Sequence, residues 1–231
     1  MKAVAVIYLF IAFLMIGMLM SCKQKLDQGP VPTPTPIESI TQLEPIAWEA
    51  NNKEAVKWSQ FVMQEVKKDF DTFEKAQDIT LFCPKYNQLS KDQKLNAWAQ
   101  FFAAVSYYES GWSPVSRMTE TTMGKDCITG KQIVSEGLLQ LSYCDMTWAK
   151  ACKFDWNADK DLADKDPKKT ILDPYKNISC GISIMAGQLK KHGKLVLKSS
   201  VYWAILRDES IGKYSKVTSV AKMVQKLSIC K

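Results

Sequence analysis

One acidic residue, Glu109, closes a series of apolar residues that recur at helical spacing. Leu95, Trp98, Phe102, Val105 and Glu109 fall on one face of a helix with about 100° of rotation per residue. Burial and the negative end of the helix dipole both raise the pKa of a carboxyl group at such a position. A glutamic acid that stays protonated near neutral pH can act as the general acid that cleaves a glycosidic bond. Helix geometry alone, however, favours the alternative of a solvated residue at a helix end.

Most glycosidases use two carboxylates, so a second acid is needed unless the substrate assists its own cleavage. Three acidic residues follow Glu109 closely enough in the sequence to be candidates, namely Glu120, Asp126 and Glu136. Nothing in the sequence orders them in space. Each is equally well explained as a solvated surface acid.

Two motifs change this balance in favour of catalysis. Residues 109–114, ESGWSP, resemble the Glu-Ser-x-aromatic-x-Pro signature of soluble lytic transglycosylase (SLT) domains. Residues 136–142, EGLLQLS, resemble the second signature of that family, Gly-Leu-Met/Leu-Gln followed by an apolar residue. SLT domains share a lysozyme-like fold with goose-type lysozymes, in family 23 of the glycoside hydrolases. The resemblance covers roughly residues 93–207.

The resemblance implies an all-α, lysozyme-like domain with two lobes and a substrate cleft, which cleaves MurNAc–GlcNAc bonds in peptidoglycan. Glu109 would be the general acid/base. Tyr202, in Val201-Tyr202-Trp203, is the nearest counterpart of the tyrosine in the family's Ala-Tyr-Asn signature, although the Asn is absent. The residues expected to contact the glycan are Ser110, Gly137, Leu138, Gln140 and Tyr143. The 28 residues from Glu109 to Gly137 exceed the usual family spacing, so subsite details are not transferred.

Two reactions are compatible with this resemblance. A lytic transglycosylase uses one Glu and the sugar's own 6-hydroxyl, which gives a 1,6-anhydro product, whereas a lysozyme-like hydrolase admits water and uses a second acid. The sequence leaves the product, the endo or exo mode, the acetylation state of the strand and the origin of the wall open. Two other hypotheses are a non-catalytic lipoprotein that binds peptidoglycan and a lipoprotein with an unrelated helical domain.

Aromatic residues flank both motifs and could stack on sugar rings. They are Tyr107, Tyr108, Trp112, Tyr143 and Trp148. Core packing is the more common role for any one of them. Tyr143 is the strongest candidate for the cleft, because it follows the second motif directly.

Metal ions and other cofactors are not expected. Residues 155–161, DWNADKD, begin like a calcium-binding EF-hand loop, but Lys160 occupies the glycine position and Asp166 replaces the final Glu. The single histidine, His192, lies among lysines, and no Cys-x-x-Cys spacing occurs. A zinc site is therefore not expected either.

The elements that would position these residues read as helices. The periodicity predicts a helix over residues 48–76, a connector over 81–89, and a second helix that begins with the Ser90–Gln93 capping box and ends at Gly111. A third helix is predicted from Asn177, after Asp173-Pro174, to Gly193. Shorter helices follow at about 200–207 and 218–228. We find no strand pattern and no internal repeat.

The N-terminus predicts export as a lipoprotein. Lys2 and the apolar residues 3–20 resemble a signal peptide, and Leu19-Met20-Ser21-Cys22 resembles a lipobox in which Cys22 is lipidated. An uncleaved membrane anchor is the alternative. We therefore expect a signal peptide over 1–21, a lipidated Cys22 with a Pro-rich linker over 22–37, and a catalytic domain over 38–231. The expected location is the periplasmic face of a membrane or the cell surface.

Lipidation of Cys22 would leave an even number of cysteines for disulfides in an oxidising compartment. These six are Cys83, Cys127, Cys144, Cys152, Cys180 and Cys230. Six cysteines allow 15 pairings. The pair closest in sequence, Cys144 with Cys152, is the local guess, and free thiols are the alternative.

The net charge of +7, or about +6 after residue 21, favours an anionic partner. Peptidoglycan, anionic lipid and nucleic acid all qualify, but we see no nucleic-acid-binding signature. The expected partners are therefore glycan strands, together with a membrane through the lipid anchor, and the expected state is a monomer.

Overall fold

The computed structural model describes residues 43–210 and 214–231. By its internal contacts the chain divides into residues 1–40 and a second unit, 41–231, and only the second is described here. The expected signal peptide, Cys22 and Pro-rich linker lie outside the described residues. Within the described part of the chain, no helix is long and apolar enough to cross a membrane.

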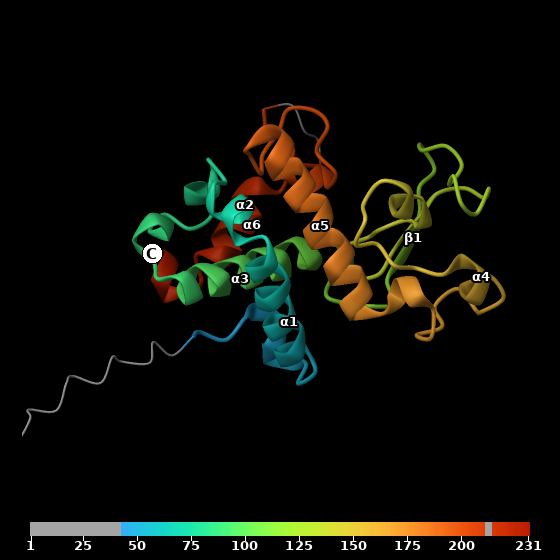
Figure 1. Ribbon diagram of the computed structural model, residues 1–231, viewed down its shortest axis with the longest axis horizontal. Coiled ribbons are helices and arrows are strands. Elements are labelled where there is room, and N and C mark those ends of the chain that lie inside the picture. Colours follow the sequence, from blue (N-terminus) through green and yellow to red (C-terminus); the bar gives the residue numbers. More distant parts are fainter. Residues whose placement is uncertain (1–42, 211–213) are drawn as a thin grey trace, which may run out of the picture. The chain divides into compact units, whose positions relative to one another are not determined.

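The helix that ends with the first motif, α3 (Lys91–Ser110), is the centre of the domain (Figure 1). Every residue from Leu95 to Ser106 is buried, so the helix is enclosed on all sides and not only along one stripe. Its predicted boundaries are confirmed. Ser90 and Gln93 form the capping box, and Gly111 ends the helix in the left-handed region at φ 61°.

Three helices pack around α3 or against its neighbours: α1 (Ala55–Lys68), α5 (Pro174–His192) and α6 (Val217–Val224). The predicted single helix over 48–76 is wrong. It divides into a 3₁₀ turn at Ala47–Asn51, α1, and the short α2 (Phe70–Glu74). The break falls at Asp69, whose backbone leaves the helical region. Its carboxylate accepts a hydrogen bond from the Thr72 hydroxyl at 2.8 Å.

The end of α5 is as predicted, with Gly193 in the left-handed region at φ 67°. Its start lies three residues before the expected one, because Asp173 caps the helix and Pro174 suits its first position. The helix expected over 200–207 is only a 3₁₀ turn, Ala204–Leu206, and that expected over 218–228 is α6 followed by a turn at Ser228–Cys230. The connector 81–89 begins at the end of a 3₁₀ turn, Ile79–Leu81, and contains a second one, Tyr86–Gln88.

The chain is mainly helical, as predicted, but it also contains a β-hairpin that the sequence pattern did not reveal. Strands β1 (Arg117–Thr119) and β2 (Val134–Glu136) pair antiparallel, with Arg117 opposite Glu136 and Thr119 opposite Val134. Strands of three residues are too short to show an alternating pattern. The hairpin lies to one side of α5, together with the short helix α4 (Trp156–Asp159) (Figure 1). Further 3₁₀ turns lie at Tyr143–Thr147 and Thr170–Leu172.

Three disulfides connect the six cysteines of this unit, as the even count predicted. The pairs are Cys83–Cys230, Cys127–Cys144 and Cys152–Cys180. The local guess of Cys144 with Cys152 is wrong, because each of these residues pairs with a cysteine of another segment. The three bonds indicate an oxidising compartment outside the cytoplasm.

Candidate active site

Glu109 occupies the last turn of α3 and is half-buried. Burial, and secondarily the nearby carboxylate of Glu120, raise its pKa to about 7. Within residues 43–210 and 214–231 no hydrogen bond or ion pair reaches its carboxyl group. Glu109 is therefore a carboxylic acid that is about half protonated at pH 7 and mostly protonated at pH 6 and below.

The hairpin supplies the second carboxylate. Side chains alternate between the two faces of a strand, so Met118 and Glu120 share one face while Arg117 and Thr119 share the other. Glu120 follows β1 directly, and its carboxylate accepts a hydrogen bond from the Ser135 hydroxyl of β2 at 2.6 Å. This bond fixes the carboxylate on the hairpin face that interacts with Glu109.

The structure separates the three candidate acids by what already binds them. Asp126 is buried and accepts backbone N–H groups from Ile128, Thr129 and Cys144, each at 2.9 Å. Such a carboxylate organises a loop and has little capacity left for water.

Glu136 is buried as well and is held in ion pairs with Arg117 at 3.2 Å and Lys169 at 3.7 Å. Burial raises its pKa, and the two cations oppose that rise. Only Glu120 therefore joins Glu109, and Asp126 and Glu136 have structural roles.

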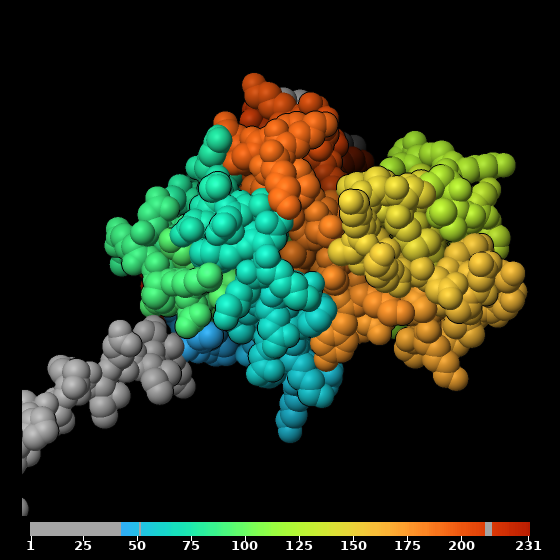
Figure 2. Space-filling model, in the orientation of Figure 1, coloured from blue at the N-terminus to red at the C-terminus, as the bar shows by residue number. Residues whose placement is uncertain are grey.

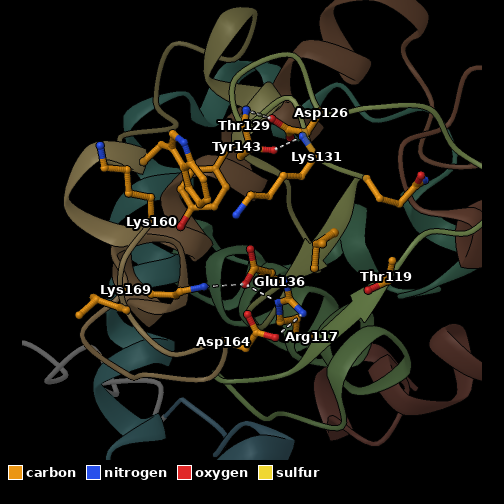
Figure 3. A pocket seen from close by; sticks show the side chains of 14 residues that line it. Arg117, Thr119, Asp126, Thr129, Lys131, Glu136, Tyr143, Lys160, Asp164 and Lys169 are labelled. Atoms are coloured by element: carbon orange, nitrogen blue, oxygen red, sulfur yellow. Dashed lines mark hydrogen bonds and ion pairs between the residues drawn. The ribbon is translucent and has the colours of Figure 1, made fainter.

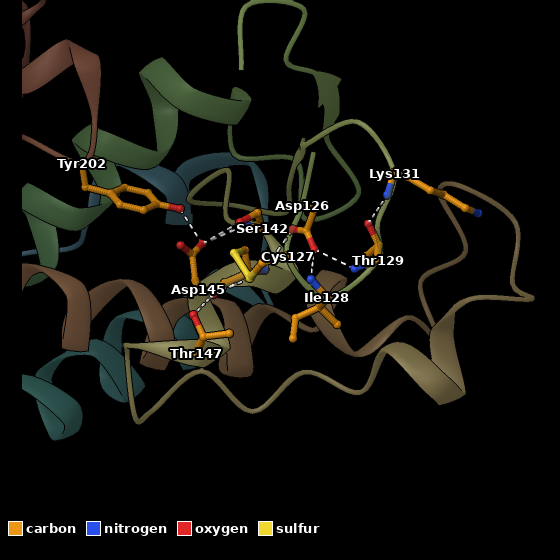
Figure 4. Close-up of a disulfide and its surroundings, with 10 residues drawn as sticks. Asp126, Cys127, Ile128, Thr129, Lys131, Ser142, Asp145, Thr147 and Tyr202 are labelled. Carbon is orange, nitrogen blue, oxygen red and sulfur yellow. Dashed lines mark hydrogen bonds between the residues drawn. A yellow bond between two sulfur atoms is a disulfide. The ribbon is translucent and has the colours of Figure 1, made fainter. Parts of the chain in front are cut away.

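Tyr202 has its hydroxyl close enough to Glu109 and Glu120 to be affected by their charges, and the hydroxyl points toward Asp145 (Figure 4). Its hydroxyl donates to Asp145 at 2.6 Å, and burial together with the charges of Asp145, Glu109 and Glu120 raises its pKa well above the ordinary value. Because the hydroxyl proton is directed to Asp145, the remaining lone pairs of the oxygen are free to accept a hydrogen bond. Asp145 is fixed in turn by the Ser142 backbone N–H at 2.8 Å.

The second motif forms a tight turn beside this site. Gly137 has φ 81°, and a Cβ atom there would lie 2.3 Å from the Asn177 side chain, so only glycine fits. The buried Asn177 accepts the Leu139 N–H at 2.8 Å and donates to the carbonyl groups of Glu136 and Ile171. These bonds fix the turn to the start of α5.

Gln140 also has a positive φ, 50°, and its side-chain amide donates to the Gly137 carbonyl at 2.8 Å. Leu138 is fully buried, so only its backbone is available to a ligand. The Ser110 hydroxyl donates to the Ser106 carbonyl of the preceding helical turn at 2.9 Å. Among the residues expected to contact glycan, these three are engaged mainly within the protein.

Tyr143, the strongest candidate for stacking on sugar, is 3% exposed. Its ring packs against Phe154 and Trp156, and its hydroxyl donates to Asp159 at 2.8 Å. It lines a pocket behind the hairpin and leaves no ring face for a sugar.

Trp148, in contrast, is 55% exposed, and its ring centre lies 6.1 Å from that of Tyr202. It borders a surface groove where residues 148–151 meet α1 and α5 (Figure 2). Trp148 is thus an exposed aromatic side chain next to Tyr202, with a ring face available for stacking, although neither Glu109 nor Glu120 lines its groove.

The segment that begins like an EF-hand loop has another role. Asp155 caps α4 through the Ala158 N–H at 3.1 Å, and Asp159 is buried, accepting bonds from Tyr143 and Thr170. No group of three or more potential metal ligands occurs in the described part of the chain.

Sequence reasoning missed Asp145, the residue that orients Tyr202. A signal for it was present, because Ser142 and Asp145 have the Ser-x-x-acid spacing of a capping box, and that capping box is formed. The resemblance drew attention to Tyr202 but gave no reason to look for its partner.

Comparison with known proteins finds a similar fold. No protein-family model and no curated protein matches the sequence. Three solved structures of the Bdellovibrio protein Bd0314 DslA are similar: a wild-type form and two single Glu-to-Gln mutants. Each has 26% sequence identity and a TM-score of 0.65 or 0.66, and each alignment covers 83% of this chain and 100% of the other. This likeness is consistent with a lysozyme-like fold.

The two mutated glutamates of DslA, at its positions 143 and 154, are eleven residues apart. Glu109 and Glu120 have the same separation. Two other pairs share it. One is Glu38 and Glu49, of which Glu38 lies outside the described residues, and the other is Glu54 and Glu65, at the start of α1 and within it, in ion pairs with Lys57 and Lys68. The spacing therefore agrees with the pair that the geometry selects.

We expect Glu120→Gln to lower the pKa of Glu109, because it removes a neighbouring negative charge that disfavours ionisation. The measurement is the pH titration of the Glu109 side-chain carboxyl signal by NMR, which does not depend on activity. A matched control is Asp161→Asn, which removes an exposed charge near α4 and should leave this titration in place. An unchanged titration in Glu120→Gln would contradict the electrostatic coupling.

Proposed function

We propose that this protein is a glycosidase that hydrolyses the MurNAc–GlcNAc bonds of peptidoglycan. The observation that carries the proposal is the pairing of a protonated acid, Glu109, with a second carboxylate, Glu120, beside the Tyr202 hydroxyl. The two SLT-like motifs at 109–114 and 136–142 and the fold shared with DslA support it. The proposal includes membership of the SLT and goose-type lysozyme family, with a glycan cleft between the α3 end and the hairpin.

The carboxyl groups divide the reaction between them. Protonated Glu109 donates its proton to the glycosidic oxygen as the bond from that oxygen to the anomeric carbon breaks. Glu120 accepts a proton from a water molecule, whose oxygen forms the new bond to the anomeric carbon. The products are two shorter strands, one with a new reducing end. Because Glu120 assists the water, the mechanism does not require the N-acetyl group of the substrate.

The test is digestion of purified sacculi, both native and chemically de-N-acetylated, with identification of the products by mass spectrometry. Hydrolysis predicts reducing-end products. Products that end in 1,6-anhydro-muramic acid would instead identify a lytic transglycosylase that needs Glu109 but not Glu120. Absence of release from both substrates would contradict both reactions and favour the non-catalytic lipoprotein that binds peptidoglycan.

Tyr202→Phe should slow the reaction about tenfold, which corresponds to the loss of one hydrogen bond to a charged or partly charged group. Gln140→Ala should also reduce the rate less than the loss of Glu109 does.

If Asp145 acts by orienting Tyr202, Asp145→Asn should reduce kcat in the wild-type background but change it little in Tyr202→Phe. Equal effects of Asp145→Asn in both backgrounds would show that Asp145 acts on the fold through Ser142 and not through Tyr202.

A further inference from the structure

A second pocket lies on the face of the hairpin opposite to Glu120. The strand residues that line it are Arg117, Thr119, Val134 and Glu136, the alternate positions of β1 and β2. The opposite wall comes from the segment around α4 and from Lys169 (Figure 3). Its volume is about 240 Å³. Ligand pockets for drug-sized molecules typically begin at about 300 Å³, so the space suits one amino-acid residue and not a saccharide chain.

The interior of this pocket has an excess of positive charge. Lys169 is buried, with a side chain 5% exposed, and its ammonium group has one ion pair, at 3.7 Å from Glu136. No hydrogen bond to that ammonium occurs among the residues the structure describes, although it has three donors. Glu136 also serves Arg117, so one buried carboxylate faces two cations.

The other acids near the pocket do not remove this excess. Asp164 pairs with Arg117 at 3.0 Å, but its side chain is 71% exposed, and water screens such pairs. The carboxylate of Asp126 is already taken by three backbone N–H groups. The Lys169 ammonium thus has a long ion pair with Glu136 and no hydrogen bond among the described residues, and an anionic ligand in the pocket would supply acceptors for it.

Lys131 adds a cation from the opposite side. Its side chain extends into the pocket, with the ammonium 5.4 Å from the centre of the Trp156 ring (Figure 3). No acidic side chain pairs with it within residues 43–210 and 214–231. Trp156 and Leu162 give the same pocket an apolar wall. Three lysines line the pocket, Lys131, Lys160 and Lys169, and of these Lys131 and Lys169 extend toward its interior, beside a surface for a small apolar side chain (Figure 3).

We propose that this pocket binds the terminal carboxylate of a peptide, and that in the cell the peptide is a stem peptide of the glycan strand being cleaved. The identity of the peptide rests on the proposed function. A strand bound on the Glu120 face would carry its stem peptides past the edge of the hairpin. A peptide of five residues reaches about 17 Å when extended, whereas stacked sheets pack only about 10 Å apart, so a single sheet with its side chains is thin enough for such a peptide to pass from one face to the other.

The test uses the full chain, purified in detergent, and two acetylated pentapeptides that end in D-Ala-D-Ala, one with a free carboxylate and one with a C-terminal amide. Binding is followed by NMR through the indole N–H signal of Trp156, assigned with Trp156→Phe. We expect the carboxylate peptide to shift this signal and the amide to bind at least about fivefold more weakly, because it lacks the charge that Lys131 and Lys169 recognise.

Lys131→Met is the main variant, because Lys131 is exposed and its loss leaves no buried acid unpaired. It should weaken the binding of the carboxylate peptide about fivefold and leave the binding of the amide peptide unchanged. Lys222→Met, an exposed lysine of α6, is the matched control and should change neither. Equal binding of acid and amide, or an undisturbed Trp156 signal at saturating peptide, would overturn the proposal.

This experiment is independent of catalysis. Peptide binding without release of muropeptides from sacculi would overturn the proposed function and keep the carboxylate pocket. Release of muropeptides without binding of the carboxylate peptide would overturn the pocket and keep the function.

Discussion

Glu109→Gln is expected to lower the release of muropeptides from sacculi at least about a hundredfold, the lower range for loss of general acid/base catalysis. Glutamine has nearly the size of the acid and can keep the end of α3 packed, but it has no proton to give to the glycosidic oxygen. The measurement is the initial rate of product formation at pH 6, where most Glu109 is protonated. A variant with nearly the wild-type rate would show that Glu109 is not the acid.

The same variant should gain stability at alkaline pH, which separates a catalytic role from a structural one. The folded pKa of Glu109, about 7, lies above its ordinary value of 4.5. Between these values the folded protein binds more protons than the unfolded chain, so the unfolding free energy falls as pH rises and remains lower above pH 7. Glutamine does not ionise and avoids this loss.

At pH 8 we therefore expect the free energy of unfolding of Glu109→Gln to exceed that of the wild type by about 1–3 kcal/mol. At pH 4 the two proteins should have equal free energies of unfolding. Urea denaturation at both pH values measures the difference. Loss of stability at pH 8 would mean that the carboxylate is held by favourable contacts, contrary to its assignment as a destabilised catalytic acid.

Removing the Cys83–Cys230 disulfide is expected to cost about 5 kcal/mol of unfolding free energy, because it closes the longest loop among the three disulfides. The two cysteines are 147 residues apart, and both are fully buried. Cys230 follows α6 near the C-terminus, so the bond fixes that end of the chain to the turn after Ile79–Leu81. The double variant to alanine, compared by urea denaturation, measures the loss.

The matched control is the double alanine variant of Cys127 and Cys144. The disulfide between these two residues closes a loop of only 17 residues. Its expected loss is smaller, about 3 kcal/mol. It should nevertheless affect sacculus digestion more than the first variant, because Cys144 adjoins Asp145 and thus the support of Tyr202 (Figure 4). A larger stability loss from this shorter loop would contradict the entropic argument.

The sequence predicted those features that depend on neighbouring residues. The limits of α3 followed from Ser90, Gln93 and Gly111, whose capping roles act within one helical turn. The apolar residues before Glu109 suggested a raised pKa, but they alone favoured a solvated acid, and the motifs at 109–114 and 136–142 were needed to select it. Three disulfides followed from an even number of cysteines. Each of these inferences needs only local spacing or a count.

The features that the sequence did not predict depend on contacts between distant segments. The partner of Cys152 is Cys180, which the fold and not proximity in sequence selects. The selection of Glu120 over Asp126 and Glu136 depended on which backbone amides and cations had already engaged each carboxylate. The three-residue strands that orient Glu120 are specified by pairing with each other and carry no periodic pattern of their own.

The alternation of side chains along β1 has an evolutionary consequence. Insertion or deletion of one residue between Arg117 and Glu120 would place both side chains on the same face of the hairpin, so that either Glu120 would turn toward the rear pocket or Arg117 toward Glu109. The excursion from residue 121 to 132 carries no such constraint, because its base is closed by the Glu120 N–H bond to the Ile133 carbonyl at 2.9 Å and its middle by the Cys127–Cys144 bond. Relatives should therefore vary in the length of this excursion more readily than in the strands, provided that Asp126, Cys127 and Lys131 keep their contacts. New substrate preferences can then arise by remodelling the excursion, with the catalytic pair left in place.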